Sequence, residues 1–405
     1  MDERLEVLRR QRTRFGPIQP DQLWRMPNPQ PRREVPPENL VSRTSRLVLL
    51  PRDASVRPLL RESEVFLGAY ELPVSARLPF GVPGVSGTRL ATTPRSSAPR
   101  ERRERMLRVE PHIPDWLPLG FHPTPAFERK APILRNRKGR SIRLSEDTHV
   151  QIFGSDDRIN IYPDTYPERC VCRIFVYTQD IPDGPWIYRK RGTGFMAGSR
   201  ILMTSGHMRP PEPYAGWMIK VVPGSYDDVS VYGPNFYTFA EYHVWYQSDT
   251  GDDLMACRLY DNLGDTTGYF GAISYDDDWE GMAVWTMCGY PYDIGAMRPS
   301  YQGAISAIDD DDGDDITLPN GAGADTTQIE TLADEASGAS GSPLYSWFTD
   351  GNMYAIGVHH GRETDGEFLG SNTHSVASGG DGFVALVKWA RDNWDKEDLG
   401  TIQMG

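Results

Sequence analysis

The sequence predicts an all-β protein from residue 151 onward, with a different region before it. Three observations carry this prediction: the strand pattern, a change of composition near residue 150, and the order of three short motifs. Many short β-rich runs separated by Gly, Pro and Asp turns are typical of a barrel or sandwich. The runs that we expect to form strands are Cys170–Thr178, Trp186–Lys190, Thr193–Ala197, Ile201–Thr204, Trp217–Val222 and Met282–Met287.

The first 150 residues differ from the rest in charge and composition. They hold 28 Lys and Arg against 17 Asp and Glu, whereas residues 151–405 hold 15 against 39. Residues 1–40 are rich in Arg and Pro and lack periodicity, which is typical of disorder. We therefore expect a basic, Pro/Arg-rich and partly disordered N-terminal extension (1–150) that the second domain (151–400) does not need for its core. It either lies on the acidic domain, as a propeptide would, or is a solvated tail.

A serine stands in a tight turn of small residues, Gly-Ala-Ser-Gly-Ser-Pro at 338–343. The small neighbours let the backbone amides of Gly338 and Ser340 point into one space, as an oxyanion hole requires. Such turns are common, so this hexapeptide alone is a weak signal. Two upstream segments strengthen it, because one ends in His207 and the other contains Asp252 and Asp253.

His207, Asp253 and Ser340 stand in an order that indicates nucleophilic catalysis. A serine hydroxyl becomes an effective nucleophile when a histidine removes its proton and a carboxylate orients that histidine. The order His, Asp, Ser is that of chymotrypsin, while subtilisins and α/β-hydrolases use other orders. The gaps leave room for a few strands each, which suits two β-barrels with the three residues in the cleft between them.

Further motifs stand in order along the chain: Gly154–Arg158 with Tyr166-Pro167, Phe195–His207, Gly289–Pro291, Gly357–Gly361 and Val387–Trp394. Together these segments resemble the trypsin-like serine proteases, and more closely their glutamyl endopeptidase (V8-like) branch. The resemblance covers roughly residues 150–400. It implies a chymotrypsin-like fold of two six-stranded β-barrels with a short C-terminal helix. It also implies a serine endopeptidase that forms an acyl-enzyme and needs no metal or organic cofactor. The alternative is a catalytically silent protease-fold protein used for binding.

The chain departs from the trypsin pattern in two places that matter for the assignment. Ala339 stands where trypsin has the Asp that receives the new N-terminus, so activation through that ion pair is not expected. The family's Asp-x-Ala has its Ala one place late here, yet Leu259 stands at the expected distance. We therefore assign Asp253 to the triad and keep Asp252 as the alternative.

Substrate preference depends on three positions. The branch uses a histidine on its Gly-Ile-His strand and a small residue near the nucleophile to recognise glutamate; the matching residues are His359 and Ser337. Asp334 stands six residues before the serine, where trypsin keeps the Asp that selects Arg and Lys. The acidity of residues 151–405 would also steer basic substrates toward the domain. Preference for Glu is thus one of two interpretations. If His359 is instead bonded within the wall, we expect His360 to face solvent.

The cysteines and the acidic stretch indicate no metal site. The four cysteines show no CxxC spacing, and we expect free, packed thiols, although the sequence leaves their pairing open. The stretch Asp309–Asp315 lacks the first and last ligands of an EF-hand loop, and we expect an acidic surface loop. The cysteines are Cys170, Cys172, Cys257 and Cys288.

Partners and location are less constrained. No run approaches 18 apolar residues, so no membrane span is expected. We expect polypeptide substrates and no nucleic acid, and the oligomeric state stays open. The first ten residues lack the apolar core of a signal peptide, whereas the resemblance implies an extracellular protein. Localisation therefore stays open too.

Overall fold

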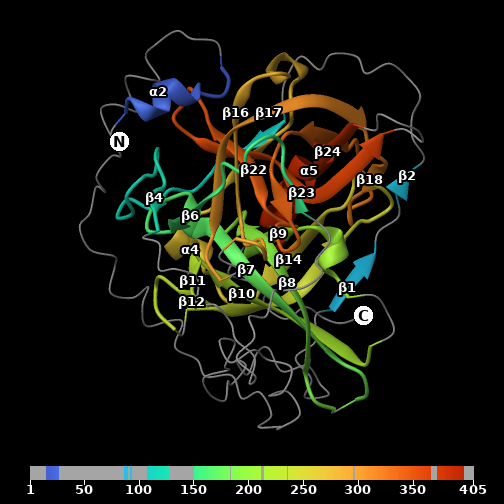
Figure 1. Cartoon of the computed structure of the whole chain (residues 1–405). Helices are drawn as coiled ribbons and strands as arrows, with labels where there is room; N and C mark the ends of the chain where they lie inside the picture. The colour runs from blue at the N-terminus through green and yellow to red at the C-terminus, as the bar shows by residue number, and fades with distance from the viewer. Residues whose placement is uncertain are drawn as a thin grey trace, which may run out of the picture.

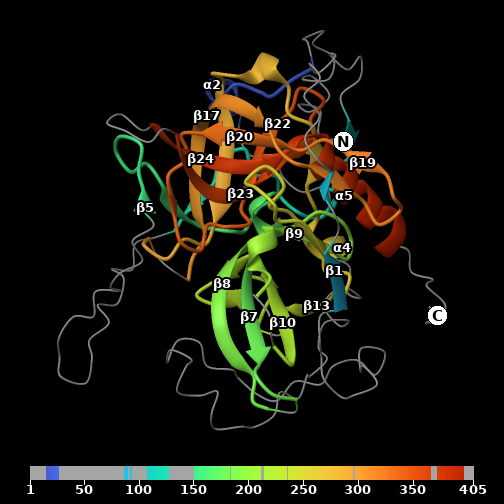
Figure 2. The ribbon, with the colours of Figure 1, turned by 90° about the vertical axis from the view of Figure 1, so that its right-hand side faces the viewer.

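The computed structural model describes residues 15–26, 86–89, 92–93, 107–126, 150–182, 184–210, 214–234, 236–294, 297–365 and 372–395. Most of these residues belong to two closed antiparallel barrels, one above the other in Figures 1 and 2. The fold is thus all-β, and two six-stranded barrels with a short C-terminal helix fit a chymotrypsin-like fold. The predicted fold class is confirmed for the described part of the chain.

The first barrel is the lower one in both views. Its strands follow the order β13-β10-β7-β8-β9-β14, and β14 pairs back with β13 to close the ring. A short strand, β1 (Ser86–Arg89), adds to β13 in parallel. The six strands are β7 (Val171–Gln179), β8 (Ile187–Met196), β9 (Ile201–Thr204), β10 (Gly216–Pro223), β13 (Thr238–Trp245) and β14 (Met255–Leu259).

The second barrel closes in the same way. Its order is β16-β22-β23-β24-β20-β17, and β16 pairs back with β17. Short strands extend it: β6 (Ile159–Tyr162) and β4 (Thr124–Pro125) beyond β17, and β15 (Gly271–Ile273) with β3 (Arg108–Val109) beside β23. The six strands are β16 (Ala283–Gly289), β17 (Ser300–Asp312), β20 (Thr327–Thr331), β22 (Pro343–Trp347), β23 (Met353–Asp365) and β24 (Asn372–Gly379).

The other elements are short. They are the helices α2 (Pro20–Trp24), α4 (Gly264–Thr267), η3 (Glu168–Cys170), η4 (Gly206–Met208) and η5 (Asp277–Trp279), and the strands β2 (Thr92–Thr93), β5 (Val150–Gln151), β11 (Ser225–Tyr226), β12 (Val229–Ser230), β18 (Asp315–Thr317), β19 (Gly323–Ala324) and β21 (Glu335–Ala336).

Most predicted strands lie within a residue or two of the observed ones. The exception is β8, which the sequence split at Gly192. A glycine there weakens a strand pattern, but a Cβ at Gly192 would lie 2.8 Å from the Met208 side chain and 3.2 Å from the Ser340 carbonyl oxygen. The glycine therefore permits a close approach within an unbroken strand. The predicted acidic loop is also partly wrong, because Asp309–Asp312 end strand β17.

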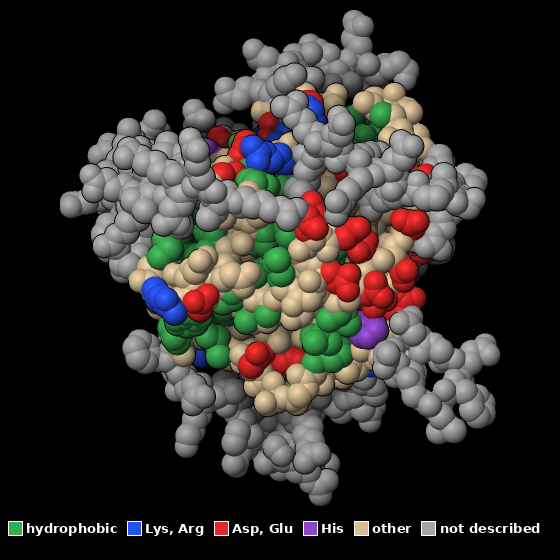
Figure 3. All heavy atoms as spheres, turned by 90° about the horizontal axis from the view of Figure 1, so that it is seen from above, with side chains coloured by type: hydrophobic (Ala, Val, Ile, Leu, Met, Phe, Trp, Pro, Cys, Tyr) green, Lys and Arg blue, Asp and Glu red, His purple; other side chains and the backbone are tan. Residues whose placement is uncertain are grey.

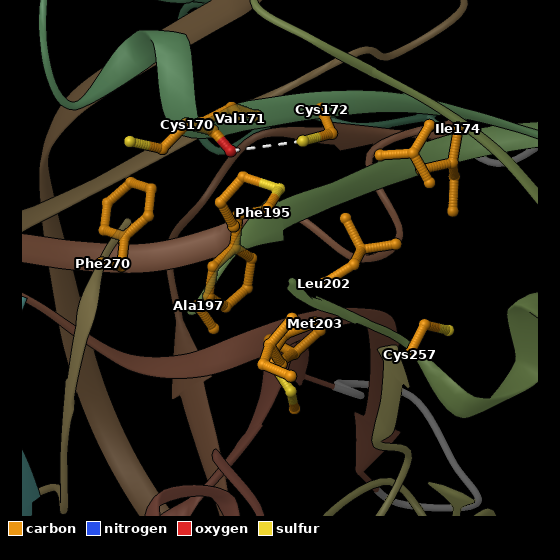
Figure 4. Close-up of a cluster of buried hydrophobic side chains, with 14 of the residues drawn as sticks. Cys170, Val171, Cys172, Ile174, Phe195, Ala197, Leu202, Met203, Cys257 and Phe270 are labelled. Carbon is orange, nitrogen blue, oxygen red and sulfur yellow. Dashed lines mark hydrogen bonds between the residues drawn. The ribbon is translucent and has the colours of Figure 1, made fainter. Parts of the chain in front are cut away.

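Helix α5 (Gly380–Trp394) begins seven residues earlier than the motif that predicted it, and its apolar face packs on the barrels. Phe383 meets Phe195 of β8 with ring centroids 6.4 Å apart. Phe195, Leu202 and Phe270 belong to one hydrophobic cluster that includes residues of both barrels (Figure 4). All four cysteines are free and buried, as expected, and the Cys172 thiol donates to the Cys170 carbonyl at 3.4 Å.

Two segments from the first 150 residues pack on the second barrel. Ile18, within the stretch expected to be disordered, is 1% exposed, and its N–H donates to the Trp347 carbonyl at 2.7 Å. The Trp347 indole in turn donates to the carbonyl of Gly120 at 3.2 Å and meets the Phe121 ring edge to face. These contacts are apolar and backbone-mediated, and one basic-on-acidic contact accompanies them, since the Arg108 guanidinium lies 3.9 Å from Asp350 Oδ2. Residues 15–26 of the predicted disordered stretch are therefore ordered and include helix α2, while residues 1–14 and 27–40 lie outside the described residues.

Charge is distributed unevenly over the surface. Figure 3, which looks down on the second barrel, shows Asp and Glu side chains gathered over one side of that face. This agrees with the acidic composition of residues 151–405. Within the described part of the chain, no helix has the length and apolar character that a membrane crossing demands.

Candidate active site

The three predicted triad residues come from turns on both barrels. His207 lies in η4, directly after β9, and Asp253 lies in the turn before β14. Ser340 lies in the turn between β21 and β22 of the second barrel. Hydrogen bonds join these turns across the barrels: the Ser205 hydroxyl donates to the His359 carbonyl at 2.9 Å, and the Thr193 N–H donates to the Ser340 carbonyl at 2.9 Å.

Asp253 holds His207 through both of its carboxylate oxygens. Oδ1 accepts the His207 backbone N–H at 2.7 Å, and Oδ2 lies 2.6 Å from His207 Nδ1. The Asp253 side chain is fully buried, and that of His207 is 28% exposed. Burial alone would raise the pKa of Asp253, but the hydrogen bonds from His207 and His360 lower it below its usual range. An ionised carboxylate only accepts, so His207 Nδ1 donates to Asp253 Oδ2 and Nε2 is the ring nitrogen that this contact leaves available.

Asp252, the alternative carboxylate, has another role in the structure. Its Oδ1 accepts the N–H groups of Ser248 and Asp249 at 2.6 and 2.9 Å, so it shapes its own turn. Burial raises the pKa of Asp252 to about 6. Of the two aspartates, Asp253 is the one that contacts His207.

The turn that carries Ser340 leaves two backbone donors available. The N–H groups of Ala339, Gly341 and Ser342 donate to Ala336, His359 and Ala339. Among the described residues, the N–H groups of Gly338 and Ser340 have no acceptor. Gly338 and Gly341 have positive φ angles of 98° and 91°, a region that favours glycine. A Cβ at Gly341 would lie 1.9 Å from the Thr193 carbonyl oxygen, so this turn tolerates no side chain there.

The Ser340 hydroxyl donates to the backbone carbonyl of His360 at 3.3 Å. Within the described part of the chain it makes no hydrogen bond to His207. His360 nonetheless connects the two residues, because its ring meets that of His207 at 5.4 Å between centroids and 89° between planes. Catalytic hydrogen bonds are often long or misaligned in enzymes without substrate.

The proposed pocket residues have partners within the chain. His359 is buried, and its Nε2 lies 2.9 Å from Glu335 Oε2. Burial alone would raise the pKa of Glu335, but the hydrogen bond with His359 lowers it. Asp334 is also buried, which raises its pKa, and its Oδ1 accepts the Phe153 N–H at 2.8 Å. The Ser337 carbonyl accepts the Tyr292 N–H at 2.8 Å.

His360 is the main site residue that the sequence did not assign. It was expected to face solvent, but its Nδ1 lies 2.5 Å from Asp253 Oδ2, and its side chain is 23% exposed. The cause is a register shift in β23 against β24 between His359 and Gly361, where one extra residue is inserted. A bulge turns a side chain out of the regular alternation. Gly361, a glycine in a strand, was the available signal.

Three donor atoms, of His207, Asp253 and His360, lie within 4.8 Å of one another, as the ligands of a metal ion would. Both nitrogens, however, lie 2.5–2.6 Å from the same carboxylate oxygen. This is the spacing of charge-assisted hydrogen bonds, and the geometry fits two donors on one acceptor.

Comparison of the sequence with protein-family models and with curated proteins gives no match. One solved structure similar to this chain is described as "Structure of Glu endopeptidase in complex with MPD". It is 18% identical, with a TM-score of 0.43, and the match covers 60% of this chain and 100% of the other. The assignment of the fold therefore rests on the strand pairings described above.

Proposed function

We propose that this protein is a serine endopeptidase in which Ser340 is the nucleophile, His207 the general base and Asp253 the residue that orients it. The observation that carries the proposal is the pair of hydrogen bonds that His207 donates to the Asp253 carboxylate, beside the turn that holds Ser340. This contact fixes the tautomer and leaves Nε2 ready to take a proton.

In this mechanism the Ser340 hydroxyl leaves the His360 carbonyl and turns toward Nε2 of His207. The oxygen attacks the carbonyl carbon of a peptide bond while its proton passes to Nε2. The N–H groups of Gly338 and Ser340 stabilise the oxyanion. His207 then gives this proton to the leaving amine as the C–N bond breaks, which leaves the acyl group on Ser340. Water attacks the acyl carbon and passes a proton to Nε2, and His207 returns that proton to the Ser340 oxygen as the ester bond breaks.

The residue preference is a separate question. A pocket for glutamate would use His359, but Glu335 already occupies its Nε2. A substrate carboxylate would have to displace an internal one, at the cost of placing two like charges together. We therefore propose that His359 is part of the pocket wall in the protein as it stands, and that Glu335 opposes cleavage after glutamate.

A fluorophosphonate probe, which reacts with activated serines, tests the proposal on the full-length chain. We expect labelling at Ser340 by peptide mapping and none in Ser340→Ala. Ser346→Ala is the matched control, because that buried hydroxyl donates to the Trp347 carbonyl at 3.3 Å in β22. A folded wild-type chain that is not labelled would favour the alternative, a silent protease-fold protein used for binding.

A further inference from the structure

His360 makes a contact that the three-residue mechanism does not use. Its Nδ1 shares the carboxylate oxygen Oδ2 of Asp253 with Nδ1 of His207, at 2.5 and 2.6 Å. Asp253 is fully buried, so its orientation depends on these donors and on the His207 backbone N–H. One face of the carboxylate is therefore held by a residue from the other barrel.

The backbone of His360 contacts the site as well. Its carbonyl accepts the Ser340 hydroxyl, and its ring packs edge to face on His207. A single residue, displaced from the strand alternation by the bulge in β23, thus touches all three residues of the proposed triad. We propose that His360 is a positioning residue, which holds Asp253 toward His207. This inference rests on the proposed function.

The ring can also change its charge. The groups facing it are Asp253 and His207 from the first barrel, Glu335 from β21, and Glu363 on its own strand. Burial alone would lower the pKa of His360, but Asp253, Glu335 and Glu363 raise it above its ordinary value. The Lys190 ammonium is a further charged group near the site, and it donates to the His207 carbonyl at 2.5 Å. Burial lowers its pKa to about 8.

A protonated His360 keeps its Nδ1–H on Asp253 and adds a positive charge next to His207. That charge repels a second positive charge in the proposed site. Removing the charge should therefore move the acidic limb of kcat/KM to higher pH. A residue that only fills space would not move this limb.

Two substitutions separate the donor from the charge. His360→Asn keeps an N–H near the Nδ1 position but cannot titrate, whereas His360→Leu removes both. We expect His360→Leu to lower kcat by about 10- to 100-fold with little change in KM, because Asp253 is no longer held toward His207. His360→Asn should recover most of kcat. Both variants should move the acidic limb upward by about one pH unit.

His374→Asn is the matched control. Its Nδ1 lies 2.6 Å from Glu330 Oε2, a similar histidine–carboxylate contact elsewhere in the second barrel. We expect this variant to keep the wild-type limb. Circular dichroism and fluorophosphonate labelling of Ser340 would accompany each pH profile.

The outcomes are distinguishable. Folded Leu and Asn variants with wild-type kcat and an unmoved limb would overturn the role of His360 while leaving the protease in place. If both variants lost kcat equally and the acidic limb of kcat/KM did not move, His360 would only fill space, and its positioning role would be overturned. A wild-type chain that is not labelled would overturn the proposed function, and this role with it.

Discussion

Thr193 of the first barrel is hydrogen-bonded to Gly338 of the second barrel, because its buried hydroxyl donates to the Gly338 carbonyl at 2.8 Å. The same hydroxyl accepts the N–H of Tyr290 at 2.9 Å. The Thr193 N–H donates to the carbonyl of Ser340. The turn that carries the proposed nucleophile is thus attached to the barrel that carries the proposed base.

Thr193→Val should lower both stability and reactivity. The substitution keeps the shape but leaves the Gly338 carbonyl and the Tyr290 N–H buried without partners, which should cost about 2–4 kcal/mol. Urea unfolding measures the loss of stability, and the rate of fluorophosphonate labelling measures the reactivity of Ser340. Thr331→Val is the control, because its hydroxyl also donates to a carbonyl (Ser375) and accepts an N–H (Ala333). It should lower stability similarly and leave the labelling rate unchanged.

Asp253→Asn should lower kcat by about 10⁴-fold with the fold intact, because the amide stabilises the wrong tautomer of His207. Asp252→Asn should change kcat by less than about threefold, since an amide oxygen can keep both bonds to its turn. Steady-state hydrolysis of a peptide substrate measures both. If Asp252→Asn were the more damaging change, the assignment of the carboxylate would be reversed.

Glu335→Gln should change the residue preference. Removing the internal carboxylate frees the His359 region for a substrate carboxylate, so the ratio of cleavage after Glu to cleavage after Gln should rise about tenfold. A peptide-library profile of both proteins measures it. A wild-type enzyme that already prefers Glu would show that Glu335 does not oppose it, and strong cleavage after Arg or Lys would promote Asp334 to the specificity residue.

Glu168 should make the protein less stable as the pH rises. This carboxyl is buried, and burial raises its pKa to about 7, above the ordinary value of 4.5. Between these two values the folded state binds more protons than the unfolded state, so stability falls with increasing pH. Glu168→Gln should remove that slope and raise stability at pH 8 by about 1–3 kcal/mol. Urea unfolding at pH 5 and pH 8 tests the sign, and a loss of stability at pH 8 would contradict it.

The N-terminal segments should matter for stability, although the composition suggested otherwise. Leu117 is 1% exposed in the core, so Leu117→Ala should cost about 2–5 kcal/mol. Leu332→Ala, at a residue 39% exposed, should cost about 0.5 kcal/mol or less. Limited proteolysis should leave a core that retains residues 107–126. A stable core that begins after residue 126 would restore the boundary at residue 150, which stays a prediction.

The sequence predicted the barrels and the site-bearing turns because those signals are local. Strand runs, glycine turns and the order His207, Asp253, Ser340 are visible without any knowledge of distant contacts. The burial of Ile18 could not be predicted in this way, because it depends on a contact with Trp347, and nothing near Ile18 in the chain indicates that partner. The orientation of His360 depends on a one-residue bulge, and strict alternation along a strand predicts the opposite face.

The division of the proposed triad between barrels has a consequence for the order of events during synthesis. The first barrel, with His207 and Asp253, is complete at β14, long before Ser340 has been made. The serine turn then becomes ordered only when β22 and β23 pair and the bulge brings His360 against Asp253. A nascent chain at that stage would carry His207 and Asp253 but neither the proposed nucleophile nor His360, so the proposed site could form only after both barrels have been made.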